Sequence, residues 1–323
     1  MRILVTGGAG FIGFHLAKKL SEKEDVVVVD NLSSYYDVKL KEARLEQIKD
    51  KVEFHKIDIS DFSPLKKIFE KHRFDLICHI AAQAGVRYSL TNPWEYKKSN
   101  IIGTLNIFEL AKKFNIKKVI YASSSSVYGG NKKVPFSEGD RVDKPISLYA
   151  ATKIANELMA HTYHHLYKID MVGLRYFTVY GPFGRPDMAM FKFTKNIFED
   201  KPIEVYNFGN MKRDFTYIDD IVDGTIKAIN FCLNNENICE IINLGNSKPV
   251  ELNYFIELLE KEIGKEAKKN FLPLQPGDMP ETYADITKAK KILGWEPKTK
   301  IEEGVKKFVE WYRDYYRNEN LSN

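Results

Sequence analysis

A glycine-rich turn lies directly after a short apolar run at the start of this 323-residue chain. The run Ile3–Thr6 suits a buried strand, and TGGAGFIG (residues 6–13) follows it with the spacing GxxGxxG. Glycines at these positions permit a tight turn and let the backbone approach a pyrophosphate, while the next helix offers free N–H groups to the phosphates. The pattern predicts a dinucleotide site, although a tight strand-to-helix turn is the plain alternative. The candidate residues here are Gly7, Gly10, Phe11, Ile12 and Gly13.

Short apolar runs alternate with helix-length stretches through the first half of the chain. The runs are rich in valine and isoleucine and nearly continuous in hydrophobicity, which is typical of strands buried on both faces. The runs are Ile3–Thr6, Val26–Asp30, Val52–Ile57, Asp75–Ile80, Lys118–Ser123 and Met171–Phe177, and the stretches include Phe11–Leu20, Phe62–Lys71, Trp94–Lys113 and Leu148–Tyr167. This alternation predicts an α/β fold of the Rossmann type with a doubly wound parallel sheet.

The regular alternation ends after Phe177. The turn-forming sequence YGPFGRP (residues 180–186) comes next, and later strand and helix signals are short. The stretches Ile221–Phe231 and Glu240–Leu244 suggest a return to the sheet, while Glu251–Ile263 and Ile301–Tyr316 are typical of surface helices. We therefore expect a dinucleotide-binding domain over residues 1–177, joined by 214–245. A smaller mixed α/β substrate lobe would comprise residues 178–213 and 246–323.

The composition excludes several classes of protein. Hydrophobic residues make up 44% of the chain and charged residues 29%, which is unlike disordered or collagen-like chains. The net charge of +5 includes no dense basic run, and no apolar stretch is long enough to span a bilayer. We expect no nucleic-acid partner and no membrane contact. Three cysteines without metal or redox spacing, and a first strand that begins directly after Met1, predict a cytoplasmic protein.

Asp30 ends the second predicted strand. A carboxylate there would accept hydrogen bonds from the adenosine ribose and would repel a 2′-phosphate. No Arg or Lys follows immediately in NLSS (residues 31–34), so the sequence favours NAD over NADP. Asn31 and Ser33 join the cofactor-binding candidates for this reason. Asp58 and Ile59, at the end of the third strand, would lie beside the adenine, although Asp58 is an equally good candidate for a helix cap.

Tyr149 and Lys153 lie four positions apart on a predicted helix that follows the fifth strand. The spacing alone carries no weight, because Tyr35/Lys39 and Tyr128/Lys132 match it too. A free phenol is a poor base at neutral pH, and a nearby ammonium group lowers its pKa. Tyr149 could then take a proton from a sugar hydroxyl while a hydride leaves the same carbon. Ser124, at the ligand-facing end of the fifth strand, would bind the reacting oxygen.

These motifs together resemble the extended short-chain dehydrogenase/reductase superfamily. TGGAGFIG, Asp30, SSSSVYG, YAATK and LRYFTVYGP occur in the order of that superfamily and span nearly the whole chain. Within it, the sequence is similar to nucleotide-sugar 4-epimerases, most closely bacterial-type UDP-glucuronate 4-epimerases. The narrower resemblance is carried by AAQAGVRYS (residues 81–89), GPFGRPDMAMFKF (residues 181–193) and NFGNMKRDFTYIDD (residues 207–220).

The resemblance implies a tightly held NAD that is reduced and reoxidised within each turnover. Tyr149 would deprotonate the 4-hydroxyl of the sugar, the 4-keto sugar would turn over, and hydride would return to its other face. Lys153 would hold the nicotinamide ribose, and further cofactor contacts would come from Ala81, Ala82, Gln83, Ser99, Asn100 and Tyr176. The resemblance also implies a homodimer, formed through the helices that include Trp94–Lys113 and Leu148–Tyr167, and a role in polysaccharide supply.

Departures from related enzymes narrow the expected chemistry. Related 4,6-dehydratases and uronate decarboxylases carry acidic residues directly after the hydroxyl residue of the fifth strand, where this chain has Ser125 and Ser126. Neutral-sugar 4-epimerases often have Asn where this chain has Thr178. Thr178 and Arg185, with Ser125 assisting, could instead bind a hexuronate carboxylate, since an arginine fork pairs bidentately with carboxylates.

The remaining predicted contacts belong to the nucleotide part of the substrate. By resemblance, Arg213 and Asp278 would bind the UDP diphosphate and the uridine ribose. Arg87 would serve a phosphate or the sugar, or would only brace a loop. No metal site is predicted, because His164 and His165 lack a third ligand at metal spacing. The alternatives left open are a UDP-glucose or UDP-N-acetylglucosamine 4-epimerase, a UDP-glucuronate decarboxylase, a net oxidoreductase and a non-catalytic dinucleotide sensor.

Overall fold

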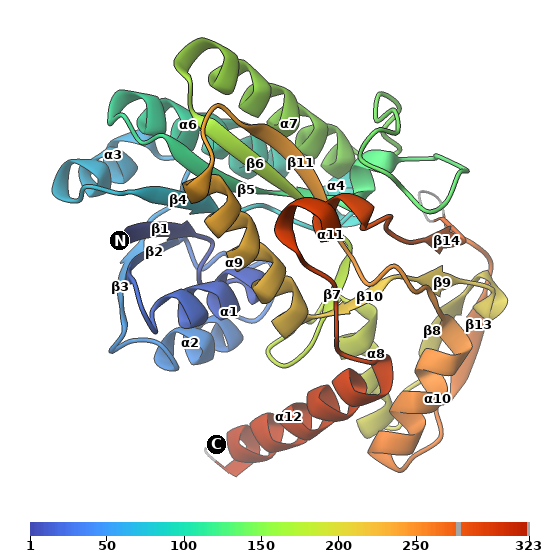
Figure 1. Ribbon diagram of the computed structural model, residues 1–323. Helices are drawn as coiled ribbons and strands as arrows, with labels where there is room; N and C mark the ends of the chain where they lie inside the picture. The colour runs from blue at the N-terminus through green and yellow to red at the C-terminus, as the bar shows by residue number, and fades with distance from the viewer. Residues whose placement is uncertain (276–278, 322–323) are drawn as a thin grey trace.

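The computed structural model describes residues 1–275 and 279–321. A seven-stranded sheet forms its centre, with the strand order β11-β6-β5-β4-β1-β2-β3 and parallel pairing throughout (Figure 1). Its strands are β1 (Arg2–Thr6), β2 (Asp25–Asp30), β3 (Val52–Lys56), β4 (Leu76–His79), β5 (Lys118–Ser124), β6 (Asp170–Tyr176) and β11 (Cys239–Leu244). The strand order reverses between β1 and β4, where the carboxyl ends of doubly wound sheets open a ligand-binding crevice.

Helices cover both faces of this sheet, which explains the continuous hydrophobicity of its strands. In β1, the side chains of Ile3 and Val5 belong to one apolar cluster and that of Leu4 to the other. The first cluster includes residues of α1 (Phe11–Leu20), α2 (Val38–Glu46) and α9 (Ile218–Asn234). The second includes residues of α3 (Phe62–Lys71), α6 (Thr104–Lys113) and α7 (Leu148–Tyr167). The predicted Rossmann-type α/β fold is confirmed.

The stretch expected as one helix over Trp94–Lys113 is interrupted. It consists of α5 (Pro93–Tyr96), a π-helical segment at Lys97–Gly103, and α6, and the short helix α4 (Tyr88–Thr91) precedes it. A π turn leaves a backbone carbonyl without its usual helical partner. Here the side chain of Asn156 donates to the carbonyl oxygen of Asn100 at 2.7 Å. Apolar periodicity cannot reveal this interruption, because it results from contacts with α7.

The chain beyond β6 both leaves the sheet and returns to it. Strand β11 pairs with β6, and α9 packs beside α1. Short sheets make up the rest, formed by β7 (Thr178–Tyr180) with β10 (Phe215–Tyr217), by β9 (Lys212–Arg213) with β12 (Val250–Glu251) and β14 (Glu281–Thr282), and by β8 (Ile203–Tyr206) with β13 (Lys269–Leu272). The helices there are α8 (Ala189–Phe198), α10 (Leu252–Ile263), α11 (Thr287–Leu293) and α12 (Ile301–Leu321), and Figure 1 shows α10 and α12 below the main sheet.

The aromatic residues near the end of the chain pack on this second part of the molecule. The Trp311 ring lies 4.9 Å from that of Phe183, and the Tyr312 ring stacks on Phe198 at 5.5 Å. Helix α12 therefore supports the loop after β7, in which Phe183 lies. Within the described residues, no helix combines the length and the apolar composition needed to cross a bilayer. All three cysteines are free, and Cys78 and Cys232 are buried.

Candidate active site

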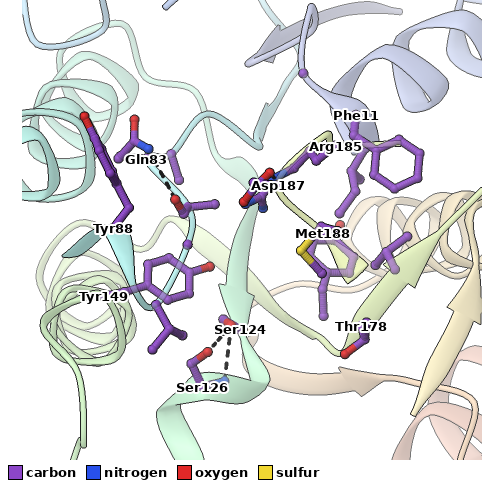
Figure 2. Close-up of a pocket in the computed structure, with 18 of the residues that line it drawn as sticks. Phe11, Gln83, Tyr88, Ser124, Ser126, Tyr149, Thr178, Arg185, Asp187 and Met188 are labelled. Atoms are coloured by element: carbon purple, nitrogen blue, oxygen red, sulfur yellow. Dashed lines mark hydrogen bonds and ion pairs between the residues drawn. The ribbon is translucent and has the colours of Figure 1, made fainter. Parts of the chain in front are cut away.

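One cavity of about 850 Å³ opens where the carboxyl ends of the strands face the second part of the molecule. The site residues predicted from the sequence line it, except Asn100, which is fully buried and does not line the cavity, and Asp278, which lies outside the described residues. Figure 2 shows side chains from well-separated segments, among them Phe11, Tyr149 and Arg185, around this space. The structure thus brings the predicted cofactor, catalytic and substrate residues together.

The glycine loop at one end of the cavity tolerates no side chain. Gly7 has a φ of +73°, and a Cβ there would lie 2.7 Å from the backbone of Ala81. A Cβ on Gly13 would lie 2.1 Å from the carbonyl oxygen of Gly7, and the N–H of Gly10 donates to that same oxygen at 2.9 Å. Gly10 is the N-cap residue of α1 and forms no side-chain hydrogen bond to the first turn of this helix. The loop therefore fits a dinucleotide pyrophosphate.

Asp30 braces this loop and also borders the cavity. Its carboxylate accepts hydrogen bonds from the backbone N–H groups of Ala9 at 3.1 Å and Leu32 at 2.8 Å. Sequence reasoning missed Lys41, which lines the cavity nearby and donates to the carbonyl oxygen of Ser33 at 2.6 Å. Lys41 could not be identified from the sequence, because it is distant from Asp30 along the chain and only the fold of helix α2 places it beside the cavity.

Asp58 lies in the turn before α3, but it does not form the helix cap considered for it, because the N-cap residue of α3 is Asp61. It lines the cavity, and it accepts hydrogen bonds from the backbone N–H and the hydroxyl of Ser60 at 2.9 and 2.7 Å. The side-chain amide of Asn31 donates to it at 3.1 Å, and Lys98 pairs with it at 2.8 Å. Although burial opposes this, these hydrogen bonds lower the pKa of Asp58 to about 2. The carboxylate is therefore ionised at neutral pH and acts there only as a hydrogen-bond acceptor.

Asn100 positions the wall that follows β4. Its side chain accepts from the backbone N–H of Gln83 at 2.8 Å and donates to the carbonyl oxygen of Gln83 at 3.0 Å. It also donates to Thr152 on α7 at 3.0 Å. This links the segment 81–83 to the helix that carries Tyr149. The hydroxyl of Tyr176 is bonded to Thr225 on α9 at 3.0 Å, so this phenol is engaged within the protein.

Tyr149, Lys153 and Ser124 meet at the centre of the cavity. The hydroxyl of Ser147 caps α7 by accepting from the N–H of Ala150 at 3.1 Å, which places Tyr149 in the first helical turn. One turn later, Lys153 donates to the carbonyl oxygen of Ala122 on β5 at 2.8 Å. Ser124 ends β5, and its hydroxyl donates to that of Ser126 at 3.2 Å. Figure 2 shows Tyr149 and Ser124 facing the same space.

Burial is the main influence on the ionisation of Tyr149. Burial raises the pKa of its phenol, and the hydrogen bond with Ser124 and the charge of Arg185 only partly oppose this. Burial also lowers the pKa of Lys153 to about 8, against a weaker opposing effect of Glu157. At this phenol, desolvation therefore outweighs the charge of Arg185.

Arg185 is held by an acidic residue that sequence reasoning missed. Its Nε donates to Oδ1 of Asp187 at 3.0 Å, and its Nη2 donates to Oδ2 of the same carboxylate. The hydroxyl of Tyr35 donates to Oδ2 as well, at 3.1 Å. All three residues line the cavity. The motif RPD indicates a turn that brings its first and third side chains together, but Tyr35 is too distant in sequence to be foreseen.

Arg44 connects the loop of Arg185 to the glycine loop. This fully buried guanidinium donates to the carbonyl oxygen of Phe183 at 2.7 Å and to that of Ala9 at 2.9 Å. It also donates to the hydroxyl of Tyr36 at 2.7 Å. A single side chain of α2 thus bridges the glycine loop and the loop after β7. Its position on a helix that the sequence did not predict explains why it was missed.

The predicted nucleotide-binding arginines lie at the far rim. The guanidinium of Arg87 lies 4.4 Å above the ring of Tyr206 on β8. Arg213, on β9, donates to the carbonyl oxygens of Lys212 at 2.9 Å and Pro280 at 3.2 Å. Thr178 and Ser125 line the space between this rim and Tyr149. Cationic side chains at this rim suit a diphosphate.

A group with potential metal ligands lies outside the cavity. Within the described part of the chain, Glu53, His55 and His72 place their ligand atoms within 4.8 Å of one another. An oxygen of Glu53 already pairs with Lys71, whose hydrogen bond is the main cause of the low pKa of that carboxyl. We assign no metal to this group. The ring of His164 bonds to the carbonyl oxygen of Ile169 at 3.0 Å and stabilises the end of α7.

The fold and the site together define a class of protein, and comparison with known families agrees. The family model described as GDP-mannose 4,6 dehydratase matches residues 4–308. The chain belongs to this family of nucleotide-sugar enzymes, within the extended short-chain dehydrogenase/reductase superfamily.

Individual relatives are more specific. A UDP-glucuronate 4-epimerase of Thermodesulfobacterium geofontis is 51% identical over 96% of both chains. An uncharacterized protein of Methanocaldococcus jannaschii is 62% identical over 96% of this chain and 95% of its own length. The crystal structure of UDP-glucuronic acid 4-epimerase from Bacillus cereus, in complex with UDP-glucuronic acid and NAD, has a TM-score of 0.91 and 37% identity. The match covers 98% of this chain and 100% of the Bacillus cereus chain.

Proposed function

We infer that this protein is an NAD-dependent epimerase that inverts C4 of a UDP-hexuronate, converting UDP-glucuronate to UDP-galacturonate. The observation that carries this inference is the meeting of Ser124, Tyr149 and Lys153 with a buried arginine, Arg185, in one cavity. The trio suits reversible oxidation of a hydroxyl, and the arginine suits the carboxylate of the sugar. The relatives named above agree with both halves of the inference.

The chain's own residues divide the chemical work at C4. The cofactor is NAD, which accepts a hydride from the sugar and returns it. Tyr149 takes the proton from the 4-hydroxyl as hydride leaves C4, and gives it back after the 4-keto sugar has turned over. Ser124 donates a hydrogen bond to the same oxygen. Lys153, pinned to the carbonyl oxygen of Ala122, presents its ammonium group to the cofactor ribose.

Binding of the substrate involves the other end of the cavity. Thr178, Ser125 and Arg185 bind the hexuronate carboxylate. Arg87 and Arg213 bind the UDP diphosphate, with Asp278 as the partner of the uridine ribose. We place the cofactor in residues 1–177 with 214–245, and a substrate lobe in residues 178–213 and 246–323. Ser125 and Arg87 contribute to substrate binding from the cofactor domain. The pairing of β11 with β6 supports this division.

The described acidic residues support epimerisation over elimination or decarboxylation. Ser125 and Ser126 occupy the positions where related dehydratases and decarboxylases have acids. Asp187 does line the cavity. Although burial disfavours its charge, the neighbouring Arg185 guanidinium lowers the pKa of Asp187, so this carboxylate is a weak base. A proton on C5 therefore has no strong base among these residues.

The protein is a homodimer in this proposal, paired through α7 and the helical stretch that ends in α6. Large apolar side chains are exposed along these segments, namely Trp94, Ile102, Leu105, Leu158 and Leu166. A monomeric mass for the wild type in sedimentation experiments would contradict this, and Leu158→Glu should dissociate a dimer. The reaction takes place in the cytoplasm, whose reducing conditions suit three free cysteines.

Proton NMR of the purified protein with UDP-glucuronate, without added NAD, tests the function. The anomeric signal of UDP-galacturonate is expected, and its appearance would also demonstrate a retained cofactor. If no product forms, NAD is added, and UDP-glucose and UDP-N-acetylglucosamine are tried. Turnover of those neutral sugars alone would remove the uronate assignment, and a UDP-pentose signal would mean decarboxylation.

A further inference from the structure

The segment Arg185–Met188 folds into a tight turn at the sugar end of the cavity. The N–H of Met188 donates to the carbonyl oxygen of Arg185 at 3.1 Å, and Pro186 occupies the second position, where its fixed φ suits such turns. The turn places Arg185 and Asp187 side by side, and Figure 2 shows them next to each other among the residues that line the cavity. Both side chains are about four-fifths buried, with exposed fractions of 21% and 22%.

The ion pair uses only one edge of the guanidinium. Asp187 accepts from Nε and from Nη2, which are adjacent along one side of the group. An arginine has five N–H donors in a planar fork, so the edge formed by Nη1 and Nη2 can pair with a second carboxylate. Arg185 is therefore able to bind the carboxylate of a sugar without giving up Asp187.

The carboxylate of Asp187 is itself held by a residue from a different segment of the chain. The hydroxyl of Tyr35, in the loop between β2 and α2, donates to Asp187 at 3.1 Å. Burial, aided by the charge of Asp187, raises the pKa of Tyr35 to about 12, so Tyr35 remains a hydrogen-bond donor. Since Asp187 also stays ionised, Arg185 and Asp187 together carry almost no net charge when the sugar is elsewhere.

We propose that Asp187 is the permanent counter-ion of Arg185, which lets the sugar carboxylate leave and re-enter its subsite during turnover. The proposal rests on the proposed function, because the 4-keto sugar must rotate and present its other face between the two hydride transfers. Without Asp187, departure of the carboxylate would leave a buried arginine unpaired, and such a charge is costly. With Asp187, the guanidinium stays paired throughout, at the expense of a weaker grip on the uronate.

Removing the charge of Asp187 tests whether this residue weakens uronate binding and allows faster turnover. We expect Asp187→Asn to bind UDP-glucuronate about tenfold more tightly in calorimetry, since one negative charge facing the sugar carboxylate is gone. The same variant should lose about tenfold in kcat, because the carboxylate leaves a more positive subsite more slowly. Affinity for UDP should not change. Asp187→Ser should behave alike, and Asp187→Glu should restore both values toward wild type.

The opposite result separates a counter-ion from a residue that only orients Arg185. If Asp187→Asn and Asp187→Ser bind UDP-glucuronate more weakly or equally, the proposal is overturned. Asp170→Asn is the matched control, because Asp170 is a buried acid paired with Lys118 at 2.8 Å that does not line the cavity. It should alter thermal stability without changing affinity or kcat.

The proposed function and this inference fail in different ways. If the wild type binds UDP-glucuronate but does not epimerise it, the function is wrong. Tighter binding by Asp187→Asn would then still support a counter-ion opposing the carboxylate, while unchanged binding would overturn it. If neither protein binds UDP-glucuronate more tightly than UDP-glucose, no carboxylate subsite exists and both are overturned.

Discussion

The two ends of the cavity differ in what lines them, namely loop backbone at one end and side chains from distant segments at the other. The dinucleotide end includes the backbone of one short loop, in which Gly7 and Gly13 leave no room for a Cβ. The sugar end is lined by side chains from distant segments, including Tyr35, Thr178 and Arg185. A backbone cradle has one shape and suits a ligand that stays bound. An exchangeable set of ion pairs suits a ligand that must move, and the following changes test that contrast.

The largest effect is expected at the dinucleotide end. Gly13→Ala would place its Cβ 2.1 Å from the carbonyl oxygen of Gly7, so the loop must shift and NAD should be lost along with all detectable turnover. Bound NAD is measured by absorbance after denaturation. Gly139→Ala is the control, because no atom lies within 4 Å of the added Cβ, and it should retain NAD. A Gly13→Ala enzyme that keeps NAD would break the contrast between the two ends.

A large effect on rate alone is expected where the two ends meet. Tyr149→Phe removes the proton acceptor, so kcat should fall about 10²- to 10⁴-fold while NAD content and UDP-sugar affinity persist. Stopped assays of UDP-galacturonate formation measure the rate. Tyr167→Phe, on the same helix but outside the cavity lining, should remain fully active. Comparable losses in both variants would show a helix effect instead of proton transfer.

A selective effect is expected at the sugar end. Arg185→Ala should raise the KM for UDP-glucuronate about 30-fold or more, which corresponds to about 2 kcal/mol for truncating one partner of a buried charge pair. It also exposes Asp187 to the sugar carboxylate. Affinity for UDP, measured by calorimetry, should change little. Equal losses for UDP-glucuronate and UDP would refute the carboxylate assignment, and Arg141→Ala, at an exposed ion pair, serves as the control.

The last effect is on stability and not on activity, and it concerns Lys153 in the protein freed of NAD. Its pKa is lowered to about 8 by burial, so between pH 8 and about 10.5 the folded state binds fewer protons than the unfolded state. The free energy of unfolding of the wild type, relative to Lys153→Met, should therefore rise with pH across that window, by up to about 1.4 kcal/mol per unit. Below pH 8 the difference should be constant. Urea unfolding at several pH values measures it, and a falling difference would contradict the burial effect.

The sequence predicted the first half of the fold because its signals are local. Valine-rich runs between amphipathic stretches indicate buried parallel strands, and the observed β1 to β6 lie close to the predicted ranges. Helix α2 was missed because its sequence VKLKEARLE has little apolar periodicity, although it buries Leu40 and Arg44. The π-helical segment at Lys97–Gly103 was missed because Asn100 hydrogen-bonds to residues on other elements, such as Thr152 on α7, and local periodicity does not record such contacts.

Most of the candidate site could also be predicted, but its electrostatics could not. The family resemblance named Tyr149, Lys153 and Arg185, and the structure places all three in one cavity. The effect of burial on the pKa of Tyr149 could not be predicted, since no motif records how deeply a side chain is buried. Asp187 was overlooked within the quoted motif GPFGRPDMAMFKF, because its meaning lies in a contact with Arg185.

By itself, the sequence determined the features that depend on neighbours along the chain. These include the GxxGxxG turn, the helical pair Tyr149 and Lys153, and the buried strands, because backbone sterics and periodicity act over a few residues. Only the tertiary structure decided the pairing of Arg185 with Asp187 and Tyr35, and the link that Arg44 makes between the two ends of the cavity. Charge and burial act through space, so their effects follow from the packing of segments far apart in sequence.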